Sequence, residues 1–110
     1  MKTSSRPQPW TRAEIRDAAD TLETIGSPLR LAVFTAASEK HENVESLRVA
    51  TGDRLGTTVS QGTVSRVLTW LAAAGLVHGG RRGKSVVYSP TVKGKRMLAM
   101  LARLRAEGGR

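Results

Sequence analysis

One segment of the sequence has the composition of a phosphate-binding site. Residues 78–85, HGGRRGKS, combine three glycines with three cationic side chains, and backbone N–H groups and Lys or Arg side chains both attract phosphate. A nucleotide-binding P-loop, G-x-x-x-x-G-K-[ST], would need its first glycine at position 78, where this chain has His78. The next residues, SVVYS, are β-branched and aromatic and predict a strand, whereas a P-loop opens a helix. We therefore interpret the segment as a basic turn between two strands.

Other chemistry-bearing residues are scarce. The chain has no cysteine and only two histidines, His41 and His78, so disulfides and thiolate chemistry are excluded and too few ligands remain for a zinc site. The basic half of the chain contains no carboxylate with which to build acid–base chemistry. We expect no metal, no cofactor and no catalytic residue, and we do not predict an enzyme. His78 is interpreted as a strand residue, with a pH-sensing role as the alternative.

The net charge of +9 is distributed unevenly along the 110 residues. Residues 1–53 carry seven basic and eight acidic side chains, whereas residues 54–106 carry ten basic side chains and no acidic one. Ordinary solvated surfaces mix both signs, so this segment favours a polyanionic partner, with a merely basic surface as the alternative. The chain shows no apolar run of membrane-spanning length and no signal-peptide pattern. We expect no membrane partner and a cytoplasmic protein.

Local signals predict three helices in the N-terminal half. Thr11 and Glu14 form a capping-box pattern at the start of the first helix, and Gly26 ends it. Ser27 as N-cap and Pro28 at the first position begin a second helix at once. A third helix begins near residue 44, and the segment GDRLGTT, residues 52–58, blurs its end. Apolar spacing places these residues inward on the second and third helices: Leu29, Leu31, Val33, Phe34, Ala37, Val44, Leu47 and Ala50.

The C-terminal half has a sharper pattern. Residues 60–77, SQGTVSRVLTWLAAAGLV, place Val64, Val67, Leu68 and Leu71 on one face of a helix that Gly75 ends. Strands at 77–79 and 85–89 with a turn at 80–84 predict a hairpin, and a last helix follows from residue 91. We predict a mainly α fold of about five helices and a two-stranded hairpin over residues 10–107, between a flexible arm at 1–9 and a disordered tail at 108–110.

This order of elements resembles the winged helix-turn-helix transcription regulators. Three stretches carry the resemblance: LETIGSPLRLAVF at 22–34, SQGTVSRVLTWLAAAGLV at 60–77 and RRGKSVVYSPT at 81–91. The chain resembles the arsenical-resistance-repressor (ArsR) family most closely, and SPTVKGKRML at 89–98 is also similar to multiple-antibiotic-resistance (MarR) regulators. The resemblance implies double-stranded DNA as the partner, a recognition helix within 60–77 and a wing at the hairpin.

The chain departs from the ArsR family at two places. The segment GDRLGTTV before residue 60 is several residues longer than the family's usual turn, which implies a longer third helix or a looser turn. The family's metal sensors use cysteines, or carboxylates and histidines on the terminal helix, and this chain has none of these at those positions. The resemblance therefore implies DNA binding without metal sensing.

Short polar residues on the exposed face of the predicted recognition helix allow close approach to base edges. Gln61 is expected to pair with adenine and Arg66 with guanine. For Ser60 the alternative is an N-cap role, and for Ser65 and Thr69 it is plain solvation. The predicted base-contacting residues are Ser60, Gln61, Thr63, Ser65, Arg66 and Thr69.

The predicted wing carries three cations, Arg81, Arg82 and Lys84. They are expected to contact phosphates or the narrow minor groove. The alternative is a charged hairpin that protects the edges of a small sheet from pairing.

Apolar stripes at both ends of so small a chain predict a homodimer. Some residues of these stripes must belong to the core instead. The candidate interface residues are Ile15, Leu22, Met97, Met100, Leu101 and Leu104.

The function predicted is that of a sequence-specific DNA-binding regulator, most simply a dimeric repressor without a cysteine-based metal sensor and with an unknown effector. Two alternatives stay open. One is an architectural DNA-binding protein of low sequence specificity. The other is a winged-helix module for protein contacts in a replication, conjugation or transcription assembly.

Overall fold

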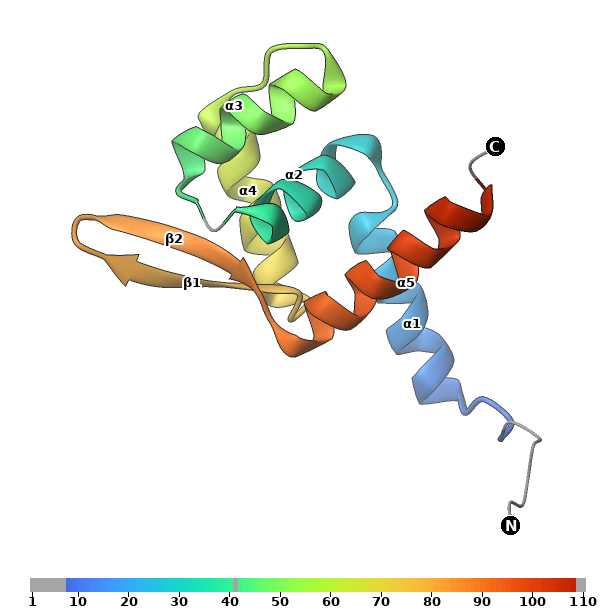
Figure 1. The fold of residues 1–110 in the computed structure, drawn as a ribbon. Helices are drawn as coiled ribbons and strands as arrows, with labels where there is room; N and C mark the ends of the chain where they lie inside the picture. The colour runs from blue at the N-terminus through green and yellow to red at the C-terminus, as the bar shows by residue number, and fades with distance from the viewer. Residues whose placement is uncertain (1–7, 41, 109–110) are drawn as a thin grey trace.

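The computed structural model describes residues 8–40 and 42–108, and it confirms the predicted fold class of five helices and a two-stranded antiparallel hairpin (Figure 1). The predicted arm at 1–9 and tail at 108–110 lie mostly outside the described residues. Within the described ranges, no helix has the length and apolar character to cross a membrane. The elements in order are α1 (Arg12–Ile25), α2 (Pro28–Glu39), α3 (Val44–Leu55), α4 (Gln61–Ala73), β1 (Val77–Arg82), β2 (Ser85–Pro90) and α5 (Val92–Gly108).

Local capping explains where the first two helices begin. The Thr11 hydroxyl accepts a hydrogen bond from the Glu14 amide at 3.1 Å, and the Glu14 carboxylate accepts one from the Thr11 amide at 2.9 Å. The Ser27 hydroxyl accepts from the Arg30 amide at 3.1 Å, and Pro28 occupies the first turn of α2. Because these contacts satisfy N–H groups that the helix itself leaves unpaired, both predicted starts are confirmed.

The hydrophobic core lies between α2, α3, α4 and the start of the hairpin. Of the residues predicted to face inward on α2 and α3, Leu29, Leu31, Val44 and Ala50 are only partly buried at the edge of this core. The fully buried side chains come mainly from α2 and α4, which therefore position everything else. The largest of them are Val33, Phe34, Leu47, Val64, Leu68, Leu71, Leu76 and Val77.

The third helix is longer than its blurred end in the sequence implies. It continues through Gly52 to Leu55, and Gly56 ends it in a left-handed conformation with φ of 70°. Position 52 has no room for a side chain, because a Cβ there would lie 2.7 Å from the carbonyl oxygen of Thr57. Thr57 is held this close because its N–H donates to the Gly52 carbonyl at 3.1 Å. Of the two alternatives raised by the long GDRLGTTV segment, the structure has the extended helix.

The hairpin corrects the predicted turn. The sequence pattern ends the first strand at residue 79, but β1 continues to Arg82, and the turn contains only Gly83 and Lys84. The strands stay paired to the end, with Arg82 opposite Ser85. A two-residue turn needs positive φ, which Gly83 supplies at 65°. Gly79 instead lies inside β1, where a Cβ would come within 2.8 Å of a Val86 methyl group.

The last helix is attached through its first turn. The Thr91 hydroxyl accepts from the Gly94 amide at 3.0 Å and donates to the Gly75 carbonyl. Gly94 is buried directly against the Leu76 carbonyl. Gly108, predicted to begin the tail, is the last residue of α5. Beyond this turn, α5 extends away from the hairpin and passes α1 (Figure 1).

Ser60 provides a stability test of the fold, because its hydroxyl accepts a hydrogen bond from the Thr63 amide at 3.0 Å and caps α4. We expect Ser60→Ala to lower the free energy of unfolding by about 1 kcal/mol, measured by urea denaturation. Ser65→Ala is the matched control, because Ser65 lies exposed in the interior of the same helix and alanine favours helix there. Equal stability of the Ser60→Ala variant and the wild type would contradict the cap.

Candidate nucleic-acid interface

Helix α4 is amphipathic, and its polar residues lie where the sequence predicts them. Val64, Val67, Leu68 and Leu71 are buried on one side. Thr63 is half-buried, and the other predicted base-contacting residues are exposed: Ser60, Gln61, Ser65, Arg66 and Thr69. The core packing of the apolar side thus determines which side of α4 is presented to a partner.

The first turn of α4 contains a small polar cluster. The Ser60 hydroxyl, besides capping the helix, donates to the Thr63 hydroxyl at 2.8 Å, and an Arg66 Nη2–H group points to the same Thr63 oxygen at 3.4 Å. Ser60 therefore has the N-cap role that the sequence offered as the alternative to base contact. Its base contact stays a prediction. Arg66 is oriented by one N–H group, which leaves its other donors for a partner.

Farther along α4, Thr69 and Trp70 follow one another on the exposed side. The Thr69 hydroxyl donates to the Ser65 carbonyl at 3.0 Å, an ordinary bond within a helix. Trp70 is 52% exposed, and the Arg30 guanidinium lies 5.3 Å from its ring centroid, within cation–π range. Reasoning from the sequence missed this pair. The signal available was a large aromatic residue outside the apolar face of a helix.

The two strands of the hairpin place the predicted wing cations on different faces. Side chains alternate along a strand. Arg81 therefore shares a face with Val86, its cross-strand partner, whereas Arg82 lies on the opposite face with Ser85. Lys84 is in the exposed turn. Val87, the partner of Gly80, lies on the Arg82 face, so each face of the ribbon combines one cation with apolar side chains.

The hairpin is tied to its neighbours through both strands. The Tyr88 amide donates to the Glu42 carbonyl at 3.0 Å, which ties β2 to the connection between α2 and α3. At its base, the Leu76 amide donates to the Leu71 carbonyl at 2.9 Å and joins β1 directly to the end of α4. The hairpin and α4 are therefore neighbouring parts of one packed unit, as Figure 1 illustrates.

Most cations of the basic half have no acidic partner within the described residues. The described residues contain two ion pairs, Arg48 with Glu45 at 2.6 Å and Arg54 with Glu39, and of these cations only Arg54 belongs to the basic half. The hydrogen bonds and charge of Arg48 lower the pKa of the Glu45 carboxyl, and the hydrogen bonds and charge of Glu45 raise the pKa of the Arg48 guanidinium. No ion pair involves α4 or the hairpin in the same ranges, so their positive charge is not neutralised.

The candidate dimer residues divide into two groups. Met97 and Leu101 are partly buried against the core. Ile15 and Leu22 on α1 and Met100 and Leu104 on α5 are exposed. The structure therefore assigns the first pair partly to the core, as expected for some of the set, and leaves the other four as candidates.

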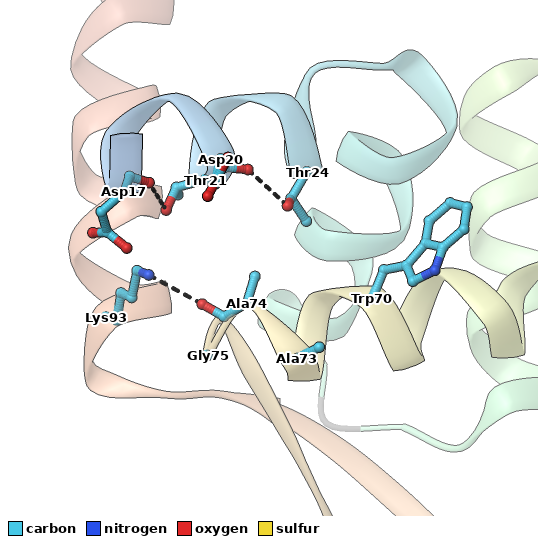
Figure 2. Close-up of a pocket in the computed structure, with 9 residues that line it drawn as sticks. All are labelled: Asp17, Asp20, Thr21, Thr24, Trp70, Ala73, Ala74, Gly75 and Lys93. Atoms are coloured by element: carbon cyan, nitrogen blue, oxygen red, sulfur yellow. Dashed lines mark hydrogen bonds between the residues drawn. The ribbon is translucent and has the colours of Figure 1, made fainter. Parts of the chain in front are cut away.

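A polar pocket lies between α1, the end of α4 and the start of α5 (Figure 2). Asp17 and Asp20 line one side, and Lys93 lines the other, where its ammonium donates to the Ala74 carbonyl at 3.0 Å. Two carboxylates make the pocket unsuited to phosphate. Among residues 8–40 and 42–108, no three metal-ligating side chains come together.

No family model and no curated protein matches the chain, but solved structures do. One is the homodimeric winged helix-turn-helix DNA-binding domain of Mb0332 from Mycobacterium bovis, a possible ArsR-family regulator, which is 21% identical with a TM-score of 0.73 over 94% of this chain and 92% of that one. HlyU from Vibrio cholerae is 25% identical, with a TM-score of 0.70 over 87% and 99%.

An ArsR-like transcriptional regulator from Rhodococcus is 20% identical, with a TM-score of 0.61 over 86% and 85% of the two chains. The predicted resemblance is thereby confirmed in the fold, while the likeness to MarR regulators stays a prediction. The chain has the winged helix-turn-helix fold, and the structures similar to it include regulators of the ArsR type.

Proposed function

We propose that the protein is a sequence-specific, double-stranded DNA-binding transcriptional regulator that acts in the cytoplasm as a homodimeric repressor. The observation that carries this proposal is the exposed, acid-free polar face of α4 beside a hairpin with three unneutralised cations. The DNA-binding role of the similar Mb0332 domain supports it. Residues 10–107 form the DNA-binding and dimerisation domain in this proposal, with no enzymatic activity.

In the proposed complex, α4 lies in the major groove and the hairpin is the wing. Gln61, Ser65 and Arg66 contact base edges, because short polar side chains and an arginine are the groups that read the major groove. Thr63 orients Arg66, and Thr69 contacts bases from the next turn. The wing cations contact the backbone or the minor groove, which supplies affinity without sequence choice. They are Arg81, Arg82 and Lys84.

The test compares two single variants on two kinds of DNA, after the preferred site has been selected from fragments of the source genome. Arg66→Ala is expected to weaken binding to the preferred site by about 1–3 kcal/mol and binding to random DNA much less. Arg82→Ala is expected to weaken both alike, because a phosphate contact carries no sequence information. Fluorescence anisotropy titrations measure both.

Two outcomes would contradict this assignment. An unchanged affinity of Arg66→Ala for the preferred site would remove α4 as the recognition helix. Equal affinity of the wild type for selected and random DNA would favour an architectural role of low sequence specificity.

We expect a dimer because the apolar side chains of α1 and α5 are exposed to solvent in the single chain, and a second copy would bury them. They are Ile15, Leu22, Met100 and Leu104. Light scattering at micromolar concentration should give twice the chain mass. Ile15→Glu combined with Met100→Glu should give the monomer, because each charge would have to be buried in the interface. A monomeric wild type would disprove the dimer. In the dimer, the two half-sites should lie about 34–36 Å apart on the DNA.

A further inference from the structure

Ser85 is the first residue of β2 and directly follows the basic turn of the hairpin. Among the serines and threonines of the sequence, only Ser85 has three cations in the four residues before it, and they are Arg81, Arg82 and Lys84. Many serine/threonine kinases select a hydroxyl with arginine three positions before it, because acidic side chains beside the kinase's catalytic site pair with that arginine. The hairpin therefore has the charge pattern of a kinase substrate.

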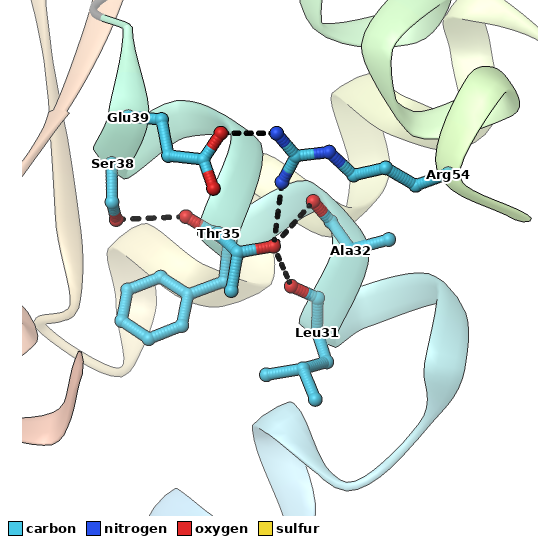
Figure 3. A network of polar contacts seen from close by, with 7 residues as sticks. Leu31, Ala32, Thr35, Ser38, Glu39 and Arg54 are labelled. Atoms are coloured by element: carbon cyan, nitrogen blue, oxygen red, sulfur yellow. Dashed lines mark hydrogen bonds and ion pairs between the residues drawn. The ribbon is translucent and has the colours of Figure 1, made fainter. Parts of the chain in front are cut away.

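Three other hydroxyls of the described residues have an arginine three positions before them, but the fold makes each one unsuitable. Thr51 is fully buried. Thr69 lies inside α4, whose other side belongs to the core, so the backbone there cannot extend. Thr57 follows Arg54, whose guanidinium already donates to the Glu39 carboxylate (Figure 3). None of the three combines an accessible hydroxyl with a free cation and an extendable backbone.

The end of the hairpin is accessible to an enzyme. Residues 78–85 are all exposed, and the hydrogen bonds that tie the hairpin to its neighbours lie outside this range, at Leu76 and Tyr88. Kinases bind the substrate segment as an extended chain, so the turn must open. Because the core does not cover this end of the ribbon, residues 81–85 can open locally while the domain stays folded.

A phosphate on Ser85 would lie among the cations of the hairpin. Ser85 is the cross-strand partner of Arg82, and such partners have Cβ atoms about 4.5–5.5 Å apart on the same face. Phosphoserine carries about −1.5 to −2 charges at pH 7 and three acceptor oxygens, so it would pair with Arg82 and with the adjacent Lys84. Both cations would then be unavailable to a nucleic acid.

We propose that Ser85 is the phosphorylation site of a serine/threonine kinase that recognises arginine, and that its phosphorylation weakens DNA binding. The Ser85 Oγ atom attacks the γ-phosphorus of a nucleoside triphosphate, the O–P bond forms, and the bond from that phosphorus to the β,γ-bridging oxygen breaks. A nucleoside diphosphate leaves, and the hydroxyl proton passes to the catalytic carboxylate of the kinase. The effect on DNA rests on the proposed function, whereas the modification does not.

Phosphoryl transfer to the purified full chain tests the site. The probe is the catalytic subunit of cAMP-dependent protein kinase with magnesium and ATP, and mass spectrometry measures and locates the product. We expect one phosphoryl group per chain, on Ser85, and none on the Ser85→Ala variant. Ser89→Ala is the matched control and should be modified like the wild type, because Ser89 lies on the same face of β2 with no cation in the four residues before it. No transfer to the wild type, or undiminished transfer to Ser85→Ala, would overturn the proposal.

Fluorescence anisotropy with the phosphorylated wild type measures the effect on DNA. If two cations are neutralised, the slope of log K against log salt should become less steep by about 1.8, and affinity at about 0.1 M salt should fall roughly tenfold or more. Ser85→Glu should have part of this effect, and the uncharged Ser85→Gln of the same size almost none. Ser89→Glu adds the same charge four residues from Ser85 and should weaken binding less than Ser85→Glu does.

The results separate this proposal from the proposed function. Equal DNA affinity of the phosphorylated and unphosphorylated wild type would disprove the regulatory effect. Equal losses in Ser85→Glu and Ser89→Glu would assign the effect to net charge and would disprove it too. If the unphosphorylated wild type does not bind DNA, the proposed function fails, and mass spectrometry still decides whether Ser85 is modified.

Discussion

Replacement of Gly94 by alanine is expected to lower the free energy of unfolding by about 3 kcal/mol, although alanine favours helix over glycine. A Cβ at this position would lie 2.1 Å from the carbonyl oxygen of Leu76 and 3.1 Å from its carbonyl carbon. These are backbone atoms between α4 and β1, so they cannot move without shifting the hairpin. Helix propensity contributes only about 1 kcal/mol in the opposite direction, so the clash decides the sign.

The measurement is unfolding by urea or by heat, followed by circular dichroism. In the thermal experiment, the unfolding midpoint should fall by roughly 10–20 °C. Gly62→Ala is the control. A Cβ there has open space, with only an Arg66 nitrogen at 4.0 Å, so we expect stability to rise by about 0.5–1 kcal/mol. A Gly94→Ala variant as stable as the wild type would mean that α5 does not approach Leu76 this closely.

Simultaneous replacement of Arg81, Arg82 and Lys84 by glutamine is expected to have the largest effect on DNA affinity. All three side chains are exposed and without ion pairs in the described part of the chain, so the variant should fold normally. If each neutralises one phosphate, the slope of log K against log salt should become less steep by about 2.7, and affinity at about 0.1 M salt should fall a hundredfold or more.

A charge-matched control separates contact from net charge. Lys95, Arg96 and Arg103 are exposed on α5, which leads away from the hairpin. Their replacement by glutamine removes the same charge and should change the salt slope by less than about 1. Equal slopes for the two triple variants would show that the hairpin makes no special contact with DNA.

The elements that the sequence predicts well are those specified by residues close together in the chain. The starts of α1, α2 and α4 follow from Thr11, Ser27 and Ser60, each of which caps an amide three residues ahead. The buried face of α4 follows from helical periodicity alone, and so does its exposed polar face. Periodicity is therefore sufficient to place the candidate base-contacting residues on one side of a helix.

Predictions that depend on distant partners are less complete. The sequence pattern predicts a hairpin turn of five residues, 80–84, because their glycines and cations are all compatible with a turn. Cross-strand pairing of Arg82 with Ser85 leaves only Gly83 and Lys84 for it. The cation–π contact of Arg30 with Trp70 and the link from Arg54 to Glu39 join residues far apart in the chain, and no local pattern indicates them.

The order of the helices, the N-caps of α1, α2 and α4, the apolar face of α4 and the uneven distribution of charge all follow from the sequence alone. These properties depend on neighbours within about one helical turn or on composition. Three features follow from the folded structure and not from the sequence: Gly83 turns the hairpin, Gly94 must lack a side chain, and certain apolar residues of α1 and α5 stay exposed. Burial depends on what packs against a residue, and the packing partners of Gly94 and of the α5 stripe come from distant elements.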